Sequence, residues 1–140
     1  MKQQGFTLIE LVVVIVILGI LAATAVPKFI DLRSNAEQAA IDGVAGGLAS
    51  ASATNFGGCA VMNNVVTANK CVKVSKCSEV GNLLQPTLTL GTTASTTAYY
   101  LAADTASATN GTGVTCTMQK DSSTGVVGWT ATYQAIGAGN

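Results

Sequence analysis

An apolar run near the N-terminus constrains this chain more than any other feature. Between residues 6 and 26 the only ionisable side chain is that of Glu10. An α-helix rises 1.5 Å per residue, so a segment of this length crosses about 30 Å, the thickness of the hydrocarbon core of a bilayer. The run therefore predicts a membrane-spanning helix, and the remainder of the 140 residues has room for one domain.

Two simple interpretations of this run compete. Met1-Lys2 is a short basic start, and Ala23-Thr24-Ala25 is typical of a signal-peptidase site. Cleavage there would remove the whole run and leave a secreted domain that begins at Val26. Without cleavage, the run would be a plain anchor for a surface domain.

Neither interpretation explains Glu10. A charged side chain at the centre of a spanning helix costs about 2.5–3.5 kcal/mol on insertion scales, so an ionisable group in a membrane is best treated as functional. If the chain is cut after Gly5, Phe6 gains an α-amino cation and stands four residues from Glu10, on the same face of a helix. Pairing these charges, within one subunit or between neighbours, offsets their desolvation and specifies the axial register of an assembly.

The N-terminal segment resembles the processing site of type IV prepilins, in the string Gly5-Phe6-Thr7-Leu8-Ile9-Glu10 and the aliphatic helix that follows. Its continuation to Pro27-Lys28-Phe29 resembles mannose-sensitive haemagglutinin-type pilins. The resemblance implies that a prepilin peptidase cuts after Gly5 and methylates the amino group of Phe6. It also implies that Glu10 pairs with the N-terminus of an adjacent subunit.

The helical period continues beyond Pro27. Apolar or small residues recur at intervals of three and four, namely Phe29, Leu32, Ala36, Ala40, Val44, Leu48 and Ala51. One long helix from Phe6 to about Asn55 is therefore predicted, with an apolar stem and an amphipathic second half. Gly19 and Pro27 weaken the stem helix, and the resemblance implies that filament subunits lose helicity between them; a kink at Pro27 is the simpler alternative.

The composition changes to Gly, Ser, Thr and short β-prone runs after Asn55, and Phe56-Gly57-Gly58 predicts the end of the helix. Residues 78–84 favour a short helical turn that is capped by Ser78 and closed by Pro86. An antiparallel meander of four strands is predicted at residues 87–90, 97–102, 113–119 and 126–135. In the last strand, residues 127, 129, 131 and 133 alternate with Gly and Thr, which indicates a face that lies against the helix.

These elements predict an α+β fold, in which a long N-terminal helix packs on a C-terminal antiparallel sheet, as the resemblance to the type IV pilin fold implies. The expected organisation is a leader peptide at residues 1–5, a transmembrane and filament-core helix at residues 6–27, and a globular head at residues 28–140.

Four cysteines lie beyond the apolar run: Cys59, Cys71, Cys77 and Cys116. An even number in this position predicts two disulfides and an extracytoplasmic domain, whereas the spacing lacks the C-x-x-C pairs of a zinc site. The favoured pairs are Cys59–Cys71, which closes a local loop, and Cys77–Cys116, which ties the short turn to a strand. The sequence leaves all three connectivities open.

Two surface features suggest binding or modification. Lys70, Lys73 and Lys76 lie in one cysteine-bounded loop that contains no acid, so this loop could bind DNA or an anionic surface, or it could simply be solvated. The Thr- and Ser-rich tract at residues 92–112 could carry glycans, and it includes the acceptor-like triplet Asn110-Gly111-Thr112.

Composition argues against catalysis. The chain contains no His, and the head offers no paired carboxylates or phosphate-binding glycine loop. We therefore predict no catalytic site, no metal and no cofactor.

The predicted role is structural. The chain is expected to be an inner-membrane prepilin that polymerises with copies of itself into an extracellular fimbrium for adhesion, twitching motility or DNA uptake. The resemblance implies a prepilin peptidase, an assembly platform, an ATPase and a secretin as partners. The alternatives are a type II secretion pseudopilin, which forms a periplasmic pseudopilus, and a singly anchored or secreted binding domain.

Overall fold

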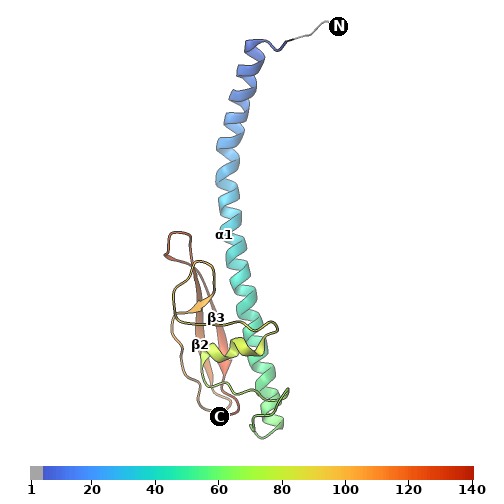
Figure 1. The fold of residues 1–140 in the computed structure, drawn as a ribbon, viewed down its shortest axis with the longest axis vertical. Helices are drawn as coiled ribbons and strands as arrows, with labels where there is room; N and C mark the ends of the chain where they lie inside the picture. The colour runs from blue at the N-terminus through green and yellow to red at the C-terminus, as the bar shows by residue number, and fades with distance from the viewer. Residues whose placement is uncertain (1–4) are drawn as a thin grey trace. The chain divides into compact units, whose positions relative to one another are not determined.

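The computed structural model describes residues 5–140, apart from the side chains of residues 26–31. Residues 1–4 of the predicted leader and the side chain of Pro27 lie outside the described residues. The chain divides into two units, residues 1–36 and residues 37–140. Its architecture is α+β, as predicted, with one long helix and a three-stranded antiparallel sheet (Figure 1).

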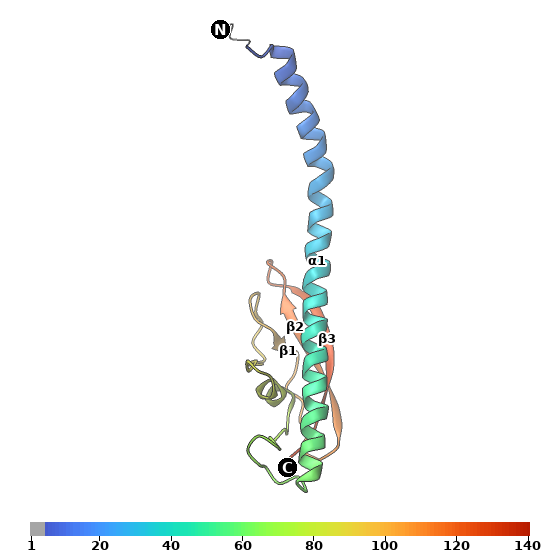
Figure 2. The same ribbon diagram turned by 90° about the vertical axis from the view of Figure 1, so that its right-hand side faces the viewer.

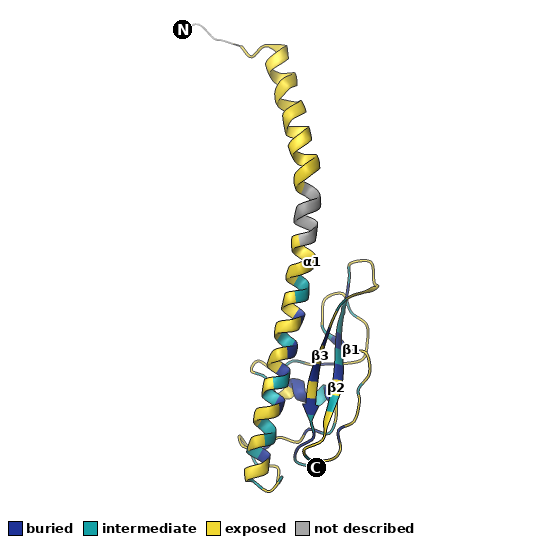
Figure 3. Ribbon diagram, turned by 180° about the vertical axis from the view of Figure 1, so that it is seen from behind, coloured by how far each residue is buried: buried dark blue, intermediate teal, exposed yellow. Residues whose placement is uncertain are grey.

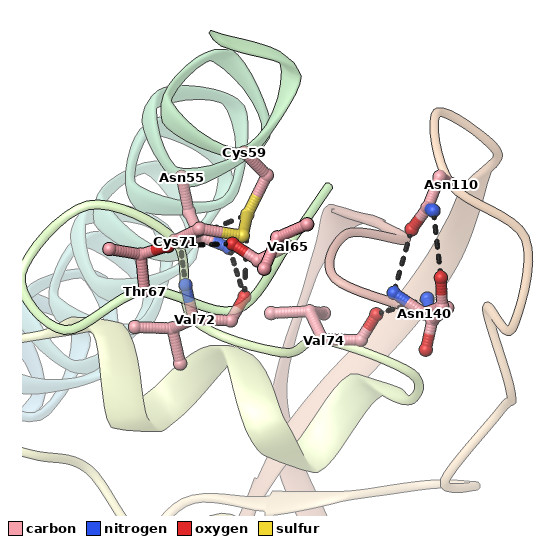
Figure 4. The surroundings of a disulfide bond; sticks show 9 residues. All are labelled: Asn55, Cys59, Val65, Thr67, Cys71, Val72, Val74, Asn110 and Asn140. Carbon is pink, nitrogen blue, oxygen red and sulfur yellow. Dashed lines mark hydrogen bonds between the residues drawn. A yellow bond between two sulfur atoms is a disulfide. The ribbon is translucent and has the colours of Figure 1, made fainter. Parts of the chain in front are cut away.

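Helix α1 spans Leu8–Val61, so it begins after Phe6 and continues past Asn55 through the predicted break. Contacts with the following loop explain the longer helix. The Nδ2 of Asn55 donates to the carbonyl oxygen of Val72 at 2.8 Å, and its Oδ1 accepts from the amide of Val72 at 2.9 Å (Figure 4). A Cβ at Gly58 would overlap the carbonyl oxygen of Lys70. Glycine here allows a loop to approach the helix closely, and it does not end the helix.

The sheet contains β1 (Tyr100–Leu101), β2 (Gly113–Asp121) and β3 (Val127–Ile136), in the order β1-β2-β3 (Figure 2). The two longest predicted strands are confirmed, and the strand predicted at residues 97–102 is reduced to two residues. The prediction of a strand at residues 87–90 is wrong. That segment is a loop because the Leu88 amide donates to the carbonyl of Gly81, while Leu90 enters the core.

The main core lies between β3 and the part of α1 in residues 37–61. The helix contributes Ile41, Ala45 and Leu48, and β3 contributes Ala131, Tyr133 and Ala135. Figure 3 shows the buried and half-buried positions of this part of α1 on the side that faces the strands. The predicted alternation in β3 is therefore confirmed from Trp129 onward. Val127 is an exception, because it is 46% exposed near the end of the hairpin.

A short 3₁₀ helix, η1 (Cys77–Leu83), replaces the helical turn predicted at residues 78–84. Ser78 does not cap it. The amide and hydroxyl of Ser78 instead donate to the two carboxylate oxygens of Asp104, at 2.8 and 2.9 Å. A carboxylate from a distant loop thus satisfies the Ser78 amide at the start of η1, which the local sequence could not reveal.

Two disulfides tie these elements together, and they join the pairs that the sequence favoured. Cys77–Cys116 links η1 to β2 inside the main core. Cys59–Cys71 links the last turns of α1 to the following loop, where the two residues and Ala138 form a second, smaller cluster.

Candidate functional site

The predicted processing site lies in exposed, irregular backbone. Gly5, Phe6 and Thr7 all precede the first residue of α1, and all three are exposed. The Phe6 side chain is 89% exposed. Proteolysis concentrates in exposed backbone of this kind, and cleavage after Gly5 stays a prediction.

Glu10 belongs to a capping box at the start of α1. Its Oε2 accepts hydrogen bonds from the amide of Thr7 at 2.8 Å and from the hydroxyl of Thr7 at 2.7 Å. The Thr7 hydroxyl oxygen in turn accepts a long bond from the Glu10 amide at 3.4 Å. Thr-x-x-Glu is the sequence pattern of this motif, so the role of Thr7 could have been predicted from residues 7–10.

The capping box changes the predicted geometry of the charge pair. In the uncut chain Phe6 lies before the helix and not on its face, so the expected four-residue helical spacing to Glu10 is absent. Glu10 uses Oε2 for both bonds to Thr7, and within the described part of the chain Oε1 accepts no hydrogen bond. The carboxylate is held at the end of the stem with one oxygen still available.

Within the described part of the chain, no residue of the apolar stem Leu8–Ala25 is buried. The segment Leu8–Ala25 has a mean hydropathy of 2.8, which is long and apolar enough for a membrane span, and none of it is buried. Side chains such as Ile15 and Leu18 are 57% and 58% exposed. Exposed apolar surface of this extent requires a lipid bilayer or another protein to cover it.

The backbone of α1 is helical from Gly19 through position 27. A Cβ at Gly19 would meet no atom within 4 Å, so no contact inside the chain requires glycine there. The Thr24 hydroxyl donates to the carbonyl of Leu21 at 3.0 Å, so this polar group is satisfied within the helix. Loss of helicity between Gly19 and Pro27 in a filament stays a prediction.

The three lysines of the predicted binding loop lie in different surroundings. All three lysines are exposed, but among the described residues only Lys76 forms an ion pair, with Asp104 at 3.3 Å. Burial raises the pKa of Asp104, but hydrogen bonds from Ser78 and the ammonium of Lys76 outweigh it, so the pKa lies below its ordinary value of 3.8. Lys76 therefore contributes to the structure of the head, and the loop is not one uniform cationic surface.

The acceptor-like triplet is also part of the structure. The Nδ2 of Asn110 donates to the carbonyl oxygen of Asn140 at 3.0 Å, and the Oδ1 of Asn110 accepts from the amide of Asn140 at 2.9 Å (Figure 4). Both ends of the Asn110 side chain are engaged, so a glycan on its nitrogen would have to break this pair.

Residues 1–26 match the family model described as the prokaryotic N-terminal methylation motif. Among characterised proteins, the chain is 57% identical over 53 residues to the type IV narrow pilus major component PilA5 of Thermus thermophilus, a match that covers 38% of this chain and 46% of the relative. It is 46% identical over 57 residues to the type IV major alpha-pilin of Moraxella bovis, covering 40% and 36%.

A third relative belongs to a secretion system. The chain is 54% identical over 37 residues to the type II secretion system core protein G of Vibrio cholerae, covering 26% of this chain and 25% of the relative. The matched region spans less than half the length of each of these relatives. No solved structure matches the chain significantly.

Proposed function

We propose that this chain, which belongs by its N-terminal segment to the type IV pilin family, is the structural subunit of a type IV pilus. One observation carries the proposal: the segment that matches the N-terminal methylation motif contains a stem whose apolar side chains are exposed in the single chain. The head, in contrast, has its own core and two disulfides. Such a chain is the subunit of a polymer, in which neighbouring stems cover the apolar surface that one stem leaves exposed.

The mechanism of assembly follows from these features. Cleavage after Gly5 creates an amine on Phe6, and repeated head-to-tail contacts between stems bury the apolar surface as subunits leave the bilayer. The available Oε1 of Glu10 accepts the amine of a neighbouring subunit, while Oε2 remains bonded to Thr7. Any other stagger leaves two unpaired charges in an apolar environment, so this pair selects the register.

The proposed localisation and partners come from the same family. The precursor is anchored in the inner membrane, a prepilin peptidase cuts it and methylates Phe6, and a platform with an ATPase and a secretin assembles the surface filament. The role is structural, without catalysis. Adhesion, motility and DNA uptake are the functions that such a filament would serve, and Lys70 and Lys73 are exposed cations of the cysteine-bounded loop that do not share the ion pair of Lys76 with Asp104.

A type II secretion pseudopilin is the second candidate, because the core protein G of that system shares the N-terminal similarity. The two candidates share a stem and differ in the assembly that they build. A pilus contains this chain as its bulk component on the cell surface, whereas a pseudopilus stays in the periplasm.

Mass spectrometry of the mature N-terminus tests the proposal first. A start at N-methylated Phe6 is expected, whereas a start at Val26 would indicate a secreted domain and an intact Met1 a plain anchor. Filaments sheared from the cell surface should then contain this chain as the main component. Normal processing with no surface filament, together with impaired protein secretion in a deletion strain, would favour the pseudopilin.

A further inference from the structure

An open groove of about 520 Å³ lies in the head, among residues 37–140. Helix α1 forms one side, with Gly47 and Ala51, and the disulfide loop forms another, with Lys70 and Val72. The end of η1 and the residues after it complete the groove. Its volume falls within the range of about 300–1,000 Å³ that is typical of small-molecule sites.

The sides of the groove are held in place before any ligand binds. The Cys59–Cys71 disulfide ties the loop to α1, and the side chain of Asn55 bonds both the amide and the carbonyl of Val72 (Figure 4). A groove that is already ordered loses little conformational entropy on binding, which favours even a small ligand.

Uncommitted amide side chains line this ordered groove. Asn69, Asn82 and Gln85 are all exposed, and within the described part of the chain none of these three side chains makes a hydrogen bond. Each amide offers two N–H donors and one carbonyl acceptor. A ligand with several hydroxyl groups, each a donor and an acceptor, satisfies such a set.

The charge in the groove is positive. Lys70 is the one charged residue among the described residues that line it, and no carboxylate is present to neutralise it. Val72 and the half-buried Leu83 add apolar surface beside these polar groups. The ligand should therefore combine hydroxyl groups, an apolar C–H face and one negative charge.

A peptide carboxylate fits this groove less well than a sugar acid. Two common modes of peptide recognition, addition of a strand to a sheet edge and capture of a terminal carboxylate by a backbone nest, use free backbone groups of the protein. Here the backbone amide and carbonyl of Val72 are already bonded to Asn55, and the Lys70 amide donates to the carbonyl of Thr67. Recognition must therefore use side-chain amides, which suit the hydroxyl groups of a saccharide.

We propose that this groove binds an acidic saccharide, with the carboxylate of a uronic acid on Lys70 and its hydroxyl groups on Asn69, Asn82 and Gln85. The inference goes beyond the proposed filament role and does not depend on it, because a single chain contains the whole groove. In a filament the site would repeat along the fibre, and multivalency would strengthen weak binding to a polysaccharide.

The test uses the full chain in detergent micelles and two disaccharides that differ at one carboxylate, cellobiouronic acid and cellobiose. NMR titration should shift the side-chain amide signals of Asn69, Asn82 and Gln85, with tighter binding of the acid. Lys70→Gln should weaken binding of the acid by about fivefold and bring the two affinities together, since an exposed charge contact contributes modestly. Lys73→Gln is the matched control, because Lys73 is exposed in the same loop but does not line the groove.

A second pair of variants tests the groove itself. A Cβ at Gly47 or at Gly43 meets no atom within 4 Å, but only Gly47 lines the groove. Gly47→Leu should abolish binding, whereas Gly43→Leu should leave it intact. The proposal is overturned if neither disaccharide shifts the amide signals, if Lys73→Gln acts as strongly as Lys70→Gln, or if a tetra-alanine peptide with a free carboxylate binds as tightly as the acid. Because binding is measured on single chains, a negative result would not contradict the filament proposal. Equally, failure to find filaments would not contradict saccharide binding by the groove.

Discussion

The two parts of helix α1 contrast in what covers them. From Leu8 to Ala25 the side chains are exposed, and among the described residues none of this segment is buried. From Ile41 onward the helix carries fully buried residues, including Ile41, Leu48 and Ser52, which pack on or bond to the sheet. Both parts have the same regular backbone, so helix formation and burial are decided separately in this molecule.

The contrast separates two kinds of stability. The head is stabilised by its own core and disulfides, so changes there should appear in the unfolding of an isolated chain. In the proposed function the stem gains its burial from a bilayer or from other copies, so changes there should appear in assembly. Trp129, the one Trp of the chain, lies half-buried on β3, and its fluorescence can report unfolding of the head alone.

The largest effect is expected from Glu10→Gln. Glutamine keeps the capping box with Thr7 but removes the charge, so filament yield should fall at least about tenfold while cleavage after Gly5 and head unfolding stay normal. Thr7→Ala removes the cap at a cost of about 1 kcal/mol and keeps the charge, so its effect on yield should be much smaller. The amount of protein in sheared filaments, divided by the total amount of processed protein, measures the filament yield of both variants. Equal losses from the two variants would show that Glu10 acts as a cap and not as a charge.

Removal of the disulfides should destabilise the head by different amounts. Cys77 and Cys116 are separated by 39 residues and Cys59 and Cys71 by 12. In the chain-entropy model, the paired alanine variants should lose about 4 and about 3 kcal/mol of unfolding free energy, respectively. Denaturant unfolding followed by Trp129 fluorescence measures each loss. A larger loss for the Cys59–Cys71 pair would mean that the small cluster around Ala138, not the main core, limits the stability of the head.

A matched pair of leucines compares the two parts of α1 directly. Leu48 is fully buried, whereas Leu18 is 58% exposed in the single chain. Leu48→Ala should lower the unfolding free energy of the head by about 3 kcal/mol through loss of packing and creation of a cavity. Leu18→Ala should leave head unfolding in micelles unchanged and weaken filaments instead. Destabilisation of the head by Leu18→Ala would contradict the division of α1 into an assembly part and a core part.

The smallest effect is expected from Asp104→Asn, which should change how the unfolding free energy of the head depends on pH. Its pKa is lowered in the fold, so its stabilising contribution is present above the ordinary value of 3.8 and is lost as the pH falls through the lower folded value. Asp104→Asn should cost about 1 kcal/mol near neutral pH, as for loss of a helix cap, and should flatten the fall in stability below about pH 4. Ser78→Ala removes one of the hydrogen bonds and should flatten it less. An unchanged acid profile in Asp104→Asn would show that other carboxylates cause the acid loss.

Sequence patterns predicted the elements that depend on local or periodic signals. A regular spacing of apolar residues over many positions predicted the long helix, the strands β2 and β3, and the buried face of β3. The capping box at Thr7 was equally readable in residues 7–10 but was not predicted. The end of α1 was predicted too early, because two consecutive glycines after Phe56 usually indicate a helix break. Here the loop at Lys70 packs against Gly58, and the helix continues to Val61.

Other features depended on partners far away in the sequence. Asp104 caps η1 from another loop, and the side chain of Asn55 holds the backbone of Val72. The hydroxyl of Tyr100 donates to the buried carboxylate of Asp121. No local sequence pattern predicts such hydrogen-bonded pairs, because each pair forms only when the folded chain brings the two groups together.

The amino-acid order by itself predicted a processing site and determined an apolar stem with one acid that is followed by a more polar head, because hydropathy and charge are properties of residues that persist in any conformation. Only the tertiary structure decided where α1 ends, which carboxylate bonds the start of η1 and which side chains surround the groove near Lys70. Those features depend on distances of a few ångströms between segments that are remote in the chain, and packing alone sets such distances.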